Sequence, residues 1–84
     1  MTLAQKLCAI EVGAHIRRIN ATIAYIRTEC EHAASEGYDG VVDNFPWERP
    51  LTKNERKGVL QYFAEEGIKL KLTKRAFSAS WGNK

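Results

Sequence analysis

The chain has 84 residues, of which 44% are hydrophobic and 27% are charged, and this is the composition of a single globular domain. No apolar run approaches the roughly 18 residues that a membrane span requires. The first nine residues lack the apolar run and the basic charge of a secretory signal. These features argue against a membrane-spanning or secreted protein and predict a cytoplasmic one.

The net charge of +3 is unevenly distributed along the chain. Residues 1–48 contain four basic and seven acidic residues, whereas residues 49–84 contain nine basic and three acidic residues. Opposite charge in the two halves can draw them together during folding, or it can mark a surface that a partner recognises. The sequence leaves both interpretations open.

The first predicted element is a long helix over residues 3–36. Thr2 and Gln5 have the spacing of a capping box, in which each side chain hydrogen-bonds to the other residue's backbone amide. Gly37 is placed to end the helix in the left-handed conformation, with Tyr38 as the hydrophobic contact that follows.

One face of this helix carries apolar residues spaced by four, three, four, three, four and three positions. Its members are Val12, Ile16, Ile19, Ile23, Ile26, Cys30 and Ala33. This is the heptad pattern of helices that pack lengthwise against another helix. A helix of about 50 Å is longer than such a small domain can cover. The stripe therefore predicts that the chain forms homo-oligomers through Val12, Ile16, Ile19, Ile23, Ile26 and Cys30.

Two further features of the helix bear on this prediction. Leu3, Leu7 and Ile10 form a second apolar edge, which favours packing against more than one neighbour. Gly13 costs about 1 kcal/mol relative to alanine inside a helix, so it predicts either a kink or the close approach of another backbone. The alternative to self-association is a first helix that ends early at Gly13 and is covered entirely by the sheet of its own chain.

Four shorter elements are predicted after the long helix. They are a strand over residues 41–45, a helix over 53–66, and strands over 68–73 and 77–81. Pro46 and Pro50 exclude regular structure and stiffen the loop over residues 46–51. Thr52 and Glu55 form a second capping box at the start of the second helix.

The order α-β-α-β-β predicts one α+β domain, residues 1–84, in which the long helix and the second helix pack on one face of a three-stranded sheet. The last two strands are expected to form a hairpin. If the first two strands lie side by side, they are parallel and joined by a right-handed crossover through the second helix. The opposite face of the sheet is expected to show polar side chains to solvent, namely Lys69, Lys71, Thr73, Ser78 and Ser80.

The sequence contains no glycine-rich phosphate loop, no serine-containing elbow and no His-Glu-x-x-His motif. His15 and His32 are 17 residues apart on one helix, which separates them by about 25 Å. Cys8 and Cys30 are about 33 Å apart on the same helix, too far for a disulfide within one chain. We therefore expect no catalytic residue, no metal and no cofactor, and we predict that the protein is not an enzyme.

Two groups of side chains are candidates for contact with a partner. Tyr38, Trp47 and Arg49 have the composition of a protein-binding hot spot, although Trp47 can instead fold back and close the end of the core. Basic residues gather near the chain end at Lys69, Lys71, Lys74 and Arg75, as in nucleic-acid-binding surfaces. Lysines also protect sheet edges from aggregation, so this pattern leaves both roles open.

Short motifs mark the ends of three predicted elements. The long helix ends in Ala33-Ala34-Ser35-Glu36-Gly37, the second helix is followed by Gly67-Ile68-Lys69-Leu70, and the last strand ends in Ser80-Trp81. This pattern resembles that of small accessory proteins of tailed bacteriophages. The resemblance implies a phage origin, and its motifs carry no chemistry.

The sequence as a whole predicts a non-enzymatic, protein-binding accessory factor that works in the host cytoplasm. Such a factor inhibits a host protein or joins a virion assembly. The alternative function is a nucleic-acid-binding module that uses the basic residues near the chain end.

Overall fold

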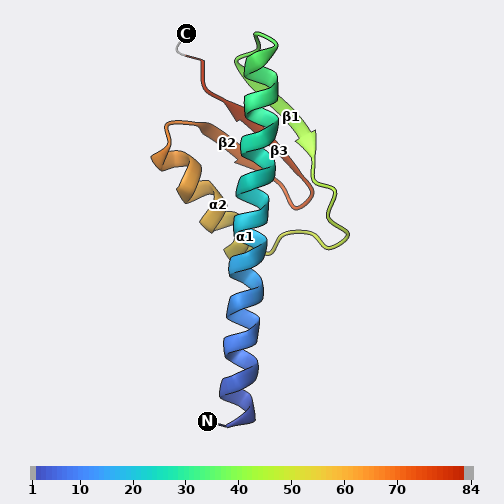
Figure 1. The fold of residues 1–84 in the computed structure, drawn as a ribbon, viewed down its shortest axis with the longest axis vertical. Coiled ribbons are helices and arrows are strands. Elements are labelled where there is room, and N and C mark those ends of the chain that lie inside the picture. The colour runs from blue at the N-terminus through green and yellow to red at the C-terminus, as the bar shows by residue number, and fades with distance from the viewer. Residues whose placement is uncertain (1, 83–84) are drawn as a thin grey trace.

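The computed structural model of the chain describes residues 2–82, and Met1, Asn83 and Lys84 lie outside the described residues. Five elements follow one another as α1 (Leu3–Ser35), β1 (Gly40–Asn44), α2 (Lys53–Glu65), β2 (Lys69–Leu72) and β3 (Ala76–Ser80). The two helices lie on one face of a three-stranded sheet (Figure 1). The predicted α+β class is confirmed, and each element boundary lies within one residue of the predicted position.

Both helices begin at the predicted capping boxes. Thr2 Oγ1 accepts a hydrogen bond from the amide of Gln5 at 3.2 Å, and Gln5 Oε1 accepts one from the amide of Thr2 at 2.9 Å. Thr52 and Glu55 repeat the arrangement with distances of 3.2 and 2.9 Å. In each box two backbone donors that lack a partner inside the helix are satisfied, which fixes where the helix starts.

Glycine has two different roles along the helices. Gly37 and Gly67 follow α1 and α2 with φ angles of 91° and 77°, the left-handed conformation that glycine adopts without steric penalty. Gly13, in contrast, lies within an unbroken α1 (Figure 1). A Cβ atom at Gly13 would meet only the Arg17 side chain of the same helix, at 3.6 Å. The predicted kink at Gly13 is therefore wrong, and no other backbone of the described residues approaches it closely.

β3 lies between β1 and β2 and is antiparallel to both. The predicted hairpin of the last two strands is confirmed. The side-by-side pairing of β1 and β2 does not occur, although the two strands are parallel to each other on either side of β3. Phe77 and Ala79 of β3 are each 2% exposed, as expected for a central strand with a neighbour on both sides.

The register separates the two faces of the sheet. Phe77 pairs with Leu72 and Asp43 on the face beneath the helices, and Ala79 pairs with Leu70 on the same face. The opposite face has no helix over it and carries polar residues of β2 and β3, among them Lys69, Lys71, Ser78 and Ser80. The predicted division into a buried face and a polar face is therefore confirmed.

The core lies between the two helices and the sheet, and it occupies only one end of the molecule. Its buried members are Ile26, Cys30, Phe45, Leu51, Val59, Phe63, Phe77 and Ala79. The molecule measures 53 × 26 × 19 Å, and the first half of α1 extends beyond the body formed by α2 and the sheet (Figure 1). Within the described residues, neither helix has the length and apolar content needed to cross a membrane.

Candidate functional site

The amino-terminal part of α1, residues 3–16, is called here the projecting half. It extends beyond the body, and only its last turn lies beside the start of α2 (Figure 1). Its large apolar side chains are between 51% and 71% exposed, namely Leu3, Leu7, Ile10, Val12 and Ile16. Monomeric proteins rarely leave a large contiguous apolar surface exposed, and such surfaces mark interaction sites. The projecting half is therefore the candidate binding element of this chain.

The exposed apolar residues lie on two sides of the projecting half. With 3.6 residues per turn, Leu3, Leu7 and Ile10 fall on one side of the helix. Val12 and Ile16 fall on nearly the opposite side. A helix that is apolar on both sides is ordinarily buried between neighbours. The projecting half thus offers two faces for contact.

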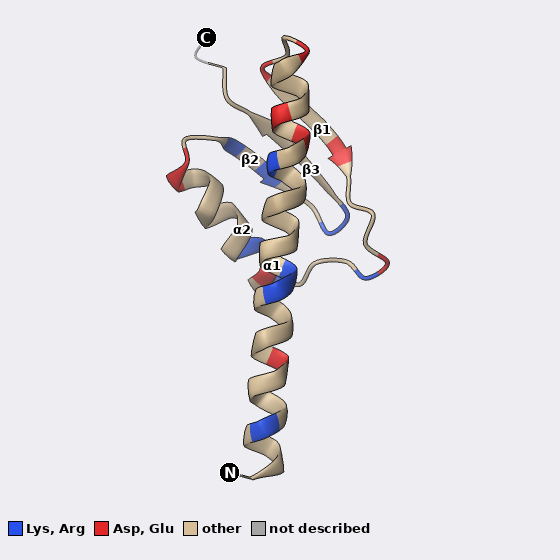
Figure 2. Cartoon of the chain, in the orientation of Figure 1, with Lys and Arg blue, Asp and Glu red and all other residues tan. Residues whose placement is uncertain are grey.

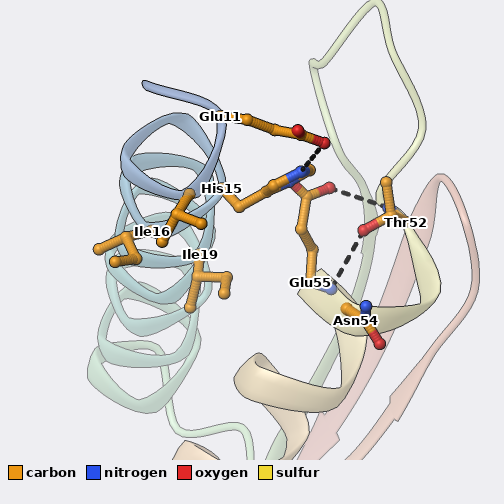
Figure 3. A pocket seen from close by; sticks show the side chains of 8 residues that line it. Glu11, His15, Ile16, Ile19, Thr52, Asn54 and Glu55 are labelled. Atoms are coloured by element: carbon orange, nitrogen blue, oxygen red, sulfur yellow. Dashed lines mark hydrogen bonds and ion pairs between the residues drawn. The ribbon is translucent and has the colours of Figure 1, made fainter. Parts of the chain in front are cut away.

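A groove runs between α1 and the start of α2, with a volume of about 470 Å³ (Figure 3). Val12, Ile16 and Ile19 form its apolar wall. Its polar lining consists of Glu11, His15, Thr52, Asn54 and Glu55. An open groove with an apolar wall and a few polar groups suits an apolar side chain that carries or adjoins a polar group.

Glu55 forms the buried polar centre beside this groove, with 1% of its surface exposed. Its Oε1 accepts hydrogen bonds from the Thr52 amide at 2.9 Å and from Arg18 Nη1 at 3.1 Å. Its Oε2 lies 2.9 Å from His15 Nδ1. Arg18 also donates to the carbonyl oxygen of Arg49 at 2.7 Å. The Glu55 carboxylate therefore caps α2 and links it to α1, and it already has three hydrogen-bond partners.

This network shifts the pKa values of its two titratable members. The hydrogen bond to Glu55 raises the pKa of His15 above its ordinary value of 6.5, and the carboxylate of Glu11 acts in the same direction. Burial by itself raises the pKa of Glu55. The hydrogen bonds from Thr52 and His15 and the charge of Arg18 outweigh burial, so this pKa lies below its ordinary value of 4.5. The charged forms of His15 and Glu55 therefore stabilise each other.

We expect the stabilising effect of His15 to be lost as the pH rises. Because its pKa is raised in the folded state, charged His15 contributes fully below about pH 6.5 and loses this contribution as the pH rises through the folded pKa. The contribution of Glu55 is present above about pH 4.5 and is lost as the pH falls through its lowered pKa. Glu11 and Arg18 are the other charged groups that face this pair.

Urea unfolding of the wild type and of His15→Gln, measured at several pH values, checks this expectation. The difference in free energy of unfolding between the two proteins should be largest near pH 5.5 and should shrink by pH 9. His32→Gln is the matched control, because His32 lies on the same helix, near Glu36, and its side chain is 71% exposed. A difference that stays constant with pH would show that the His15–Glu55 contact does not form.

The predicted interface stripe passes from an exposed to a buried environment along α1. In order, its residues are Val12, Ile16, Ile19, Ile23, Ile26 and Cys30. Val12 and Ile16 are exposed, and Ile19 is partly buried against the core. The prediction is wrong for Ile26 and Cys30, because the body of the same chain already covers them. Only the amino-terminal part of the stripe is open to a second molecule.

The predicted aromatic hot spot does not form a single patch. Tyr38 precedes β1, whereas Trp47 and Arg49 follow it, and the five residues of β1 span about 16 Å. Trp47 is half-buried, with its ring 5.9 Å from that of Tyr25 and 6.5 Å from that of Phe45. The alternative interpretation, in which Trp47 closes the end of the core, is therefore the one that the structure supports. Tyr38 and Arg49 remain exposed and separate.

The predicted basic group lies on β2 and on the turn before β3 (Figure 2). All four of its side chains are exposed, namely Lys69, Lys71, Lys74 and Arg75. Among residues 2–82, none of the four forms an ion pair. The ion pairs that join the two halves of the chain instead connect His15 and Arg18 of α1 with Glu55 of α2. Within the described residues, no acidic side chain of residues 2–48 pairs with a basic side chain of residues 49–82.

The described residues contain no group of three or more His, Cys, Asp or Glu side chains placed to hold a metal ion. Cys8 and Cys30 are free thiols, the first exposed and the second buried. Burial raises the pKa of the Cys30 thiol, and the nearby carboxylates of Glu29 and Glu31 add to this effect. A raised pKa lowers the thiolate population and makes Cys30 a poor nucleophile.

The network of His15, Arg18 and Glu55 is the part of the site that sequence reasoning missed. The sequence predicts Glu55 only as a capping residue, and it singles out His15 only for its distance from His32. A signal was present in the spacing, because His15, Arg18 and Thr22 follow one another by three and four positions along the edge of the apolar stripe. Thr22 is buried and donates to the carbonyl oxygen of Arg18 at 2.8 Å.

In comparisons with known proteins, no protein-family model, no curated protein and no solved structure matches the chain.

Proposed function

We propose that this chain is a non-enzymatic, protein-binding accessory factor that self-associates through the projecting half of α1. The observation that carries the proposal is the exposure of five large apolar side chains on a helical segment that extends beyond the body. An isolated helical segment of this length is marginal in water, and its apolar surface favours burial against protein. The groove between α1 and α2 supplies a second contact surface, on the opposite side of α1 from Leu3, Leu7 and Ile10.

The mass of the protein and of charge-bearing variants in solution tests self-association. We expect the wild type to sediment as a multiple of 9.5 kDa. Leu7→Asp with Ile10→Asp should weaken association by more than about 100-fold, because burying unpaired charges in an apolar contact is costly. The core should stay folded by urea unfolding, since both side chains lie outside it.

Two further variants test which face of the projecting half makes the contact between copies. Val12→Asp with Ile16→Asp places the same charges on the groove side, and Ala24→Asp places one on an exposed part of α1 beside the body. Ala24→Asp should keep the wild-type mass. A wild type that remains at 9.5 kDa at every concentration would overturn the proposal of self-association.

The phage origin belongs to this proposal as well. It rests on the motifs at the ends of the elements, and it places the protein in the host cytoplasm, bound to a host protein or to a virion component. Deletion of the coding sequence from its natural genome, followed by measurement of infectivity and virion composition, distinguishes these two partners.

The second candidate function is nucleic-acid binding through Lys69, Lys71, Lys74 and Arg75. The observation in its favour is that all four are exposed and that none forms an ion pair within residues 2–82. Phe77 argues against it, because it lies on the buried face and offers no platform for base stacking. Binding to generic DNA or RNA with an affinity that falls steeply with salt would support this function, and no binding at low salt would remove it.

A further inference from the structure

A line of residues spaced by four and three positions follows the side of α1 that lies away from the core. Its amino-terminal members, called here the seam, are Leu3, Leu7, Ile10 and Ala14. The same spacing continues through four exposed residues, namely Arg17, Ala21, Ala24 and Thr28. The body therefore leaves this side of α1 open along its length. In heptad terms, the seam residues occupy the positions d, a, d and a.

Two charged residues flank the seam. Lys6 occupies position g and Glu11 occupies position e of the next heptad, five residues later. They cannot pair within one helix, because residues five apart lie about 140° apart around the axis. Lys6 forms no ion pair within residues 2–82, and Glu11 is mostly exposed with its Oε1 3.7 Å from His15 Nε2.

The relative orientation of two copies decides whether these charges meet. In a parallel pair of helices, residue g of one copy faces residue e of the following heptad in the other. Lys6 then lies beside Glu11 of the second copy, and symmetry forms this contact twice. In an antiparallel pair, g faces g and e faces e, so Lys6 and Glu11 lie on opposite sides of the contact. The charges therefore favour the parallel orientation.

We propose that a second copy of this chain docks in parallel along Leu3, Leu7, Ile10 and Ala14, with Lys6 of each copy paired to Glu11 of the other. This inference rests on the self-association proposed above and adds its orientation and its contact residues. Arg17 occupies the next d position, where two copies would face each other with like charge, so the apolar contact ends at Ala14. The apolar wall of the groove, formed by Val12, Ile16 and Ile19, lies on the other side of α1 and stays open in each copy.

A charge-swap series tests the pairing. Lys6→Glu and Glu11→Lys should each weaken self-association by roughly tenfold, because each variant replaces two attractive contacts with two repulsive ones. The double variant should restore the wild-type dissociation constant to within about twofold. Lys53→Glu, on the exposed surface of α2, is the control and should have no effect. Weakening in the double variant equal to the product of the single effects would overturn the parallel contact.

Disulfide formation tests the orientation independently. In a Cys8→Ser background, Leu3→Cys and Ala14→Cys are each oxidised with glutathione disulfide. Parallel docking brings like positions together, so each variant alone should form a covalent dimer. Antiparallel docking brings position 3 of one copy beside position 14 of the other, so only a mixture would crosslink. Crosslinking only in the mixture would contradict the parallel orientation but not self-association. A wild type that stays monomeric would contradict both proposals.

Discussion

Replacing Glu55 with alanine is expected to lower the free energy of unfolding by about 3 kcal/mol, because it leaves the charge of Arg18 without its buried partner. The same substitution removes one acceptor of the α2 capping box and the hydrogen bond to His15. A domain of this size has a total stability of about 4–12 kcal/mol. The expected loss is therefore between about a quarter and about three quarters of the total stability.

Two controls separate the contributions of Glu55. Glu55→Gln keeps the size of the side chain and an oxygen for the Thr52 amide while removing the charge, so its cost should be smaller. Glu11→Ala removes a carboxylate that is 70% exposed and should change the stability by less than about 1 kcal/mol. Urea unfolding followed by tryptophan fluorescence measures all three. Equal effects of Glu55→Ala and Glu11→Ala would contradict the role assigned to the buried network.

Replacing Phe77 with alanine is expected to lower the free energy of unfolding by about 3–5 kcal/mol. Phe77 is 2% exposed on the central strand, and its ring lies 5.3 Å from that of Phe45 and 6.2 Å from that of Tyr25. Removal of the ring leaves a cavity among the core residues that join α1 to the sheet. Thermal unfolding by circular dichroism measures the loss.

Val42→Ala is the matched control for Phe77→Ala. Val42 lies in β1 on the open face of the sheet and is 77% exposed, so its truncation should change the stability by about 0.5 kcal/mol or less. A Phe77→Ala variant that is no less stable than Val42→Ala would mean that β3 is not the buried centre of the sheet.

The local elements of this fold follow directly from the sequence. Thr2 and Thr52 each stand three residues before a glutamine or glutamate, and Gly37 and Gly67 each stand just beyond a helix end. These signals depend only on residues close together in the chain, which is why they predict both helices to within one residue.

The order of the strands does not follow from the sequence in the same way. The alternation at Leu70 and Leu72 and at Phe77 and Ala79 places the correct side chains on the buried face whatever the strand order. Which strand takes the centre depends on how α1 and α2 cover the sheet, and this is a property of the packed molecule.

The apolar stripe illustrates a second limit of sequence reasoning. Its spacing is the same at Val12 as at Ile26, yet the first is exposed and the second is fully buried. The difference arises because the body reaches only part of a 33-residue helix. The pattern therefore predicts that something covers the stripe, but not where the same chain ends and another molecule begins.

We propose that another protein molecule covers the projecting half of α1. Amide hydrogen exchange of residues 7–16, measured at a low and a high concentration of the wild type, tests this proposal. Residues 22–33 pack on the core and should be protected at both concentrations. Residues 7–16 should become protected only as the concentration rises. Fast exchange of residues 7–16 at both concentrations, beside an unchanged core, would contradict it.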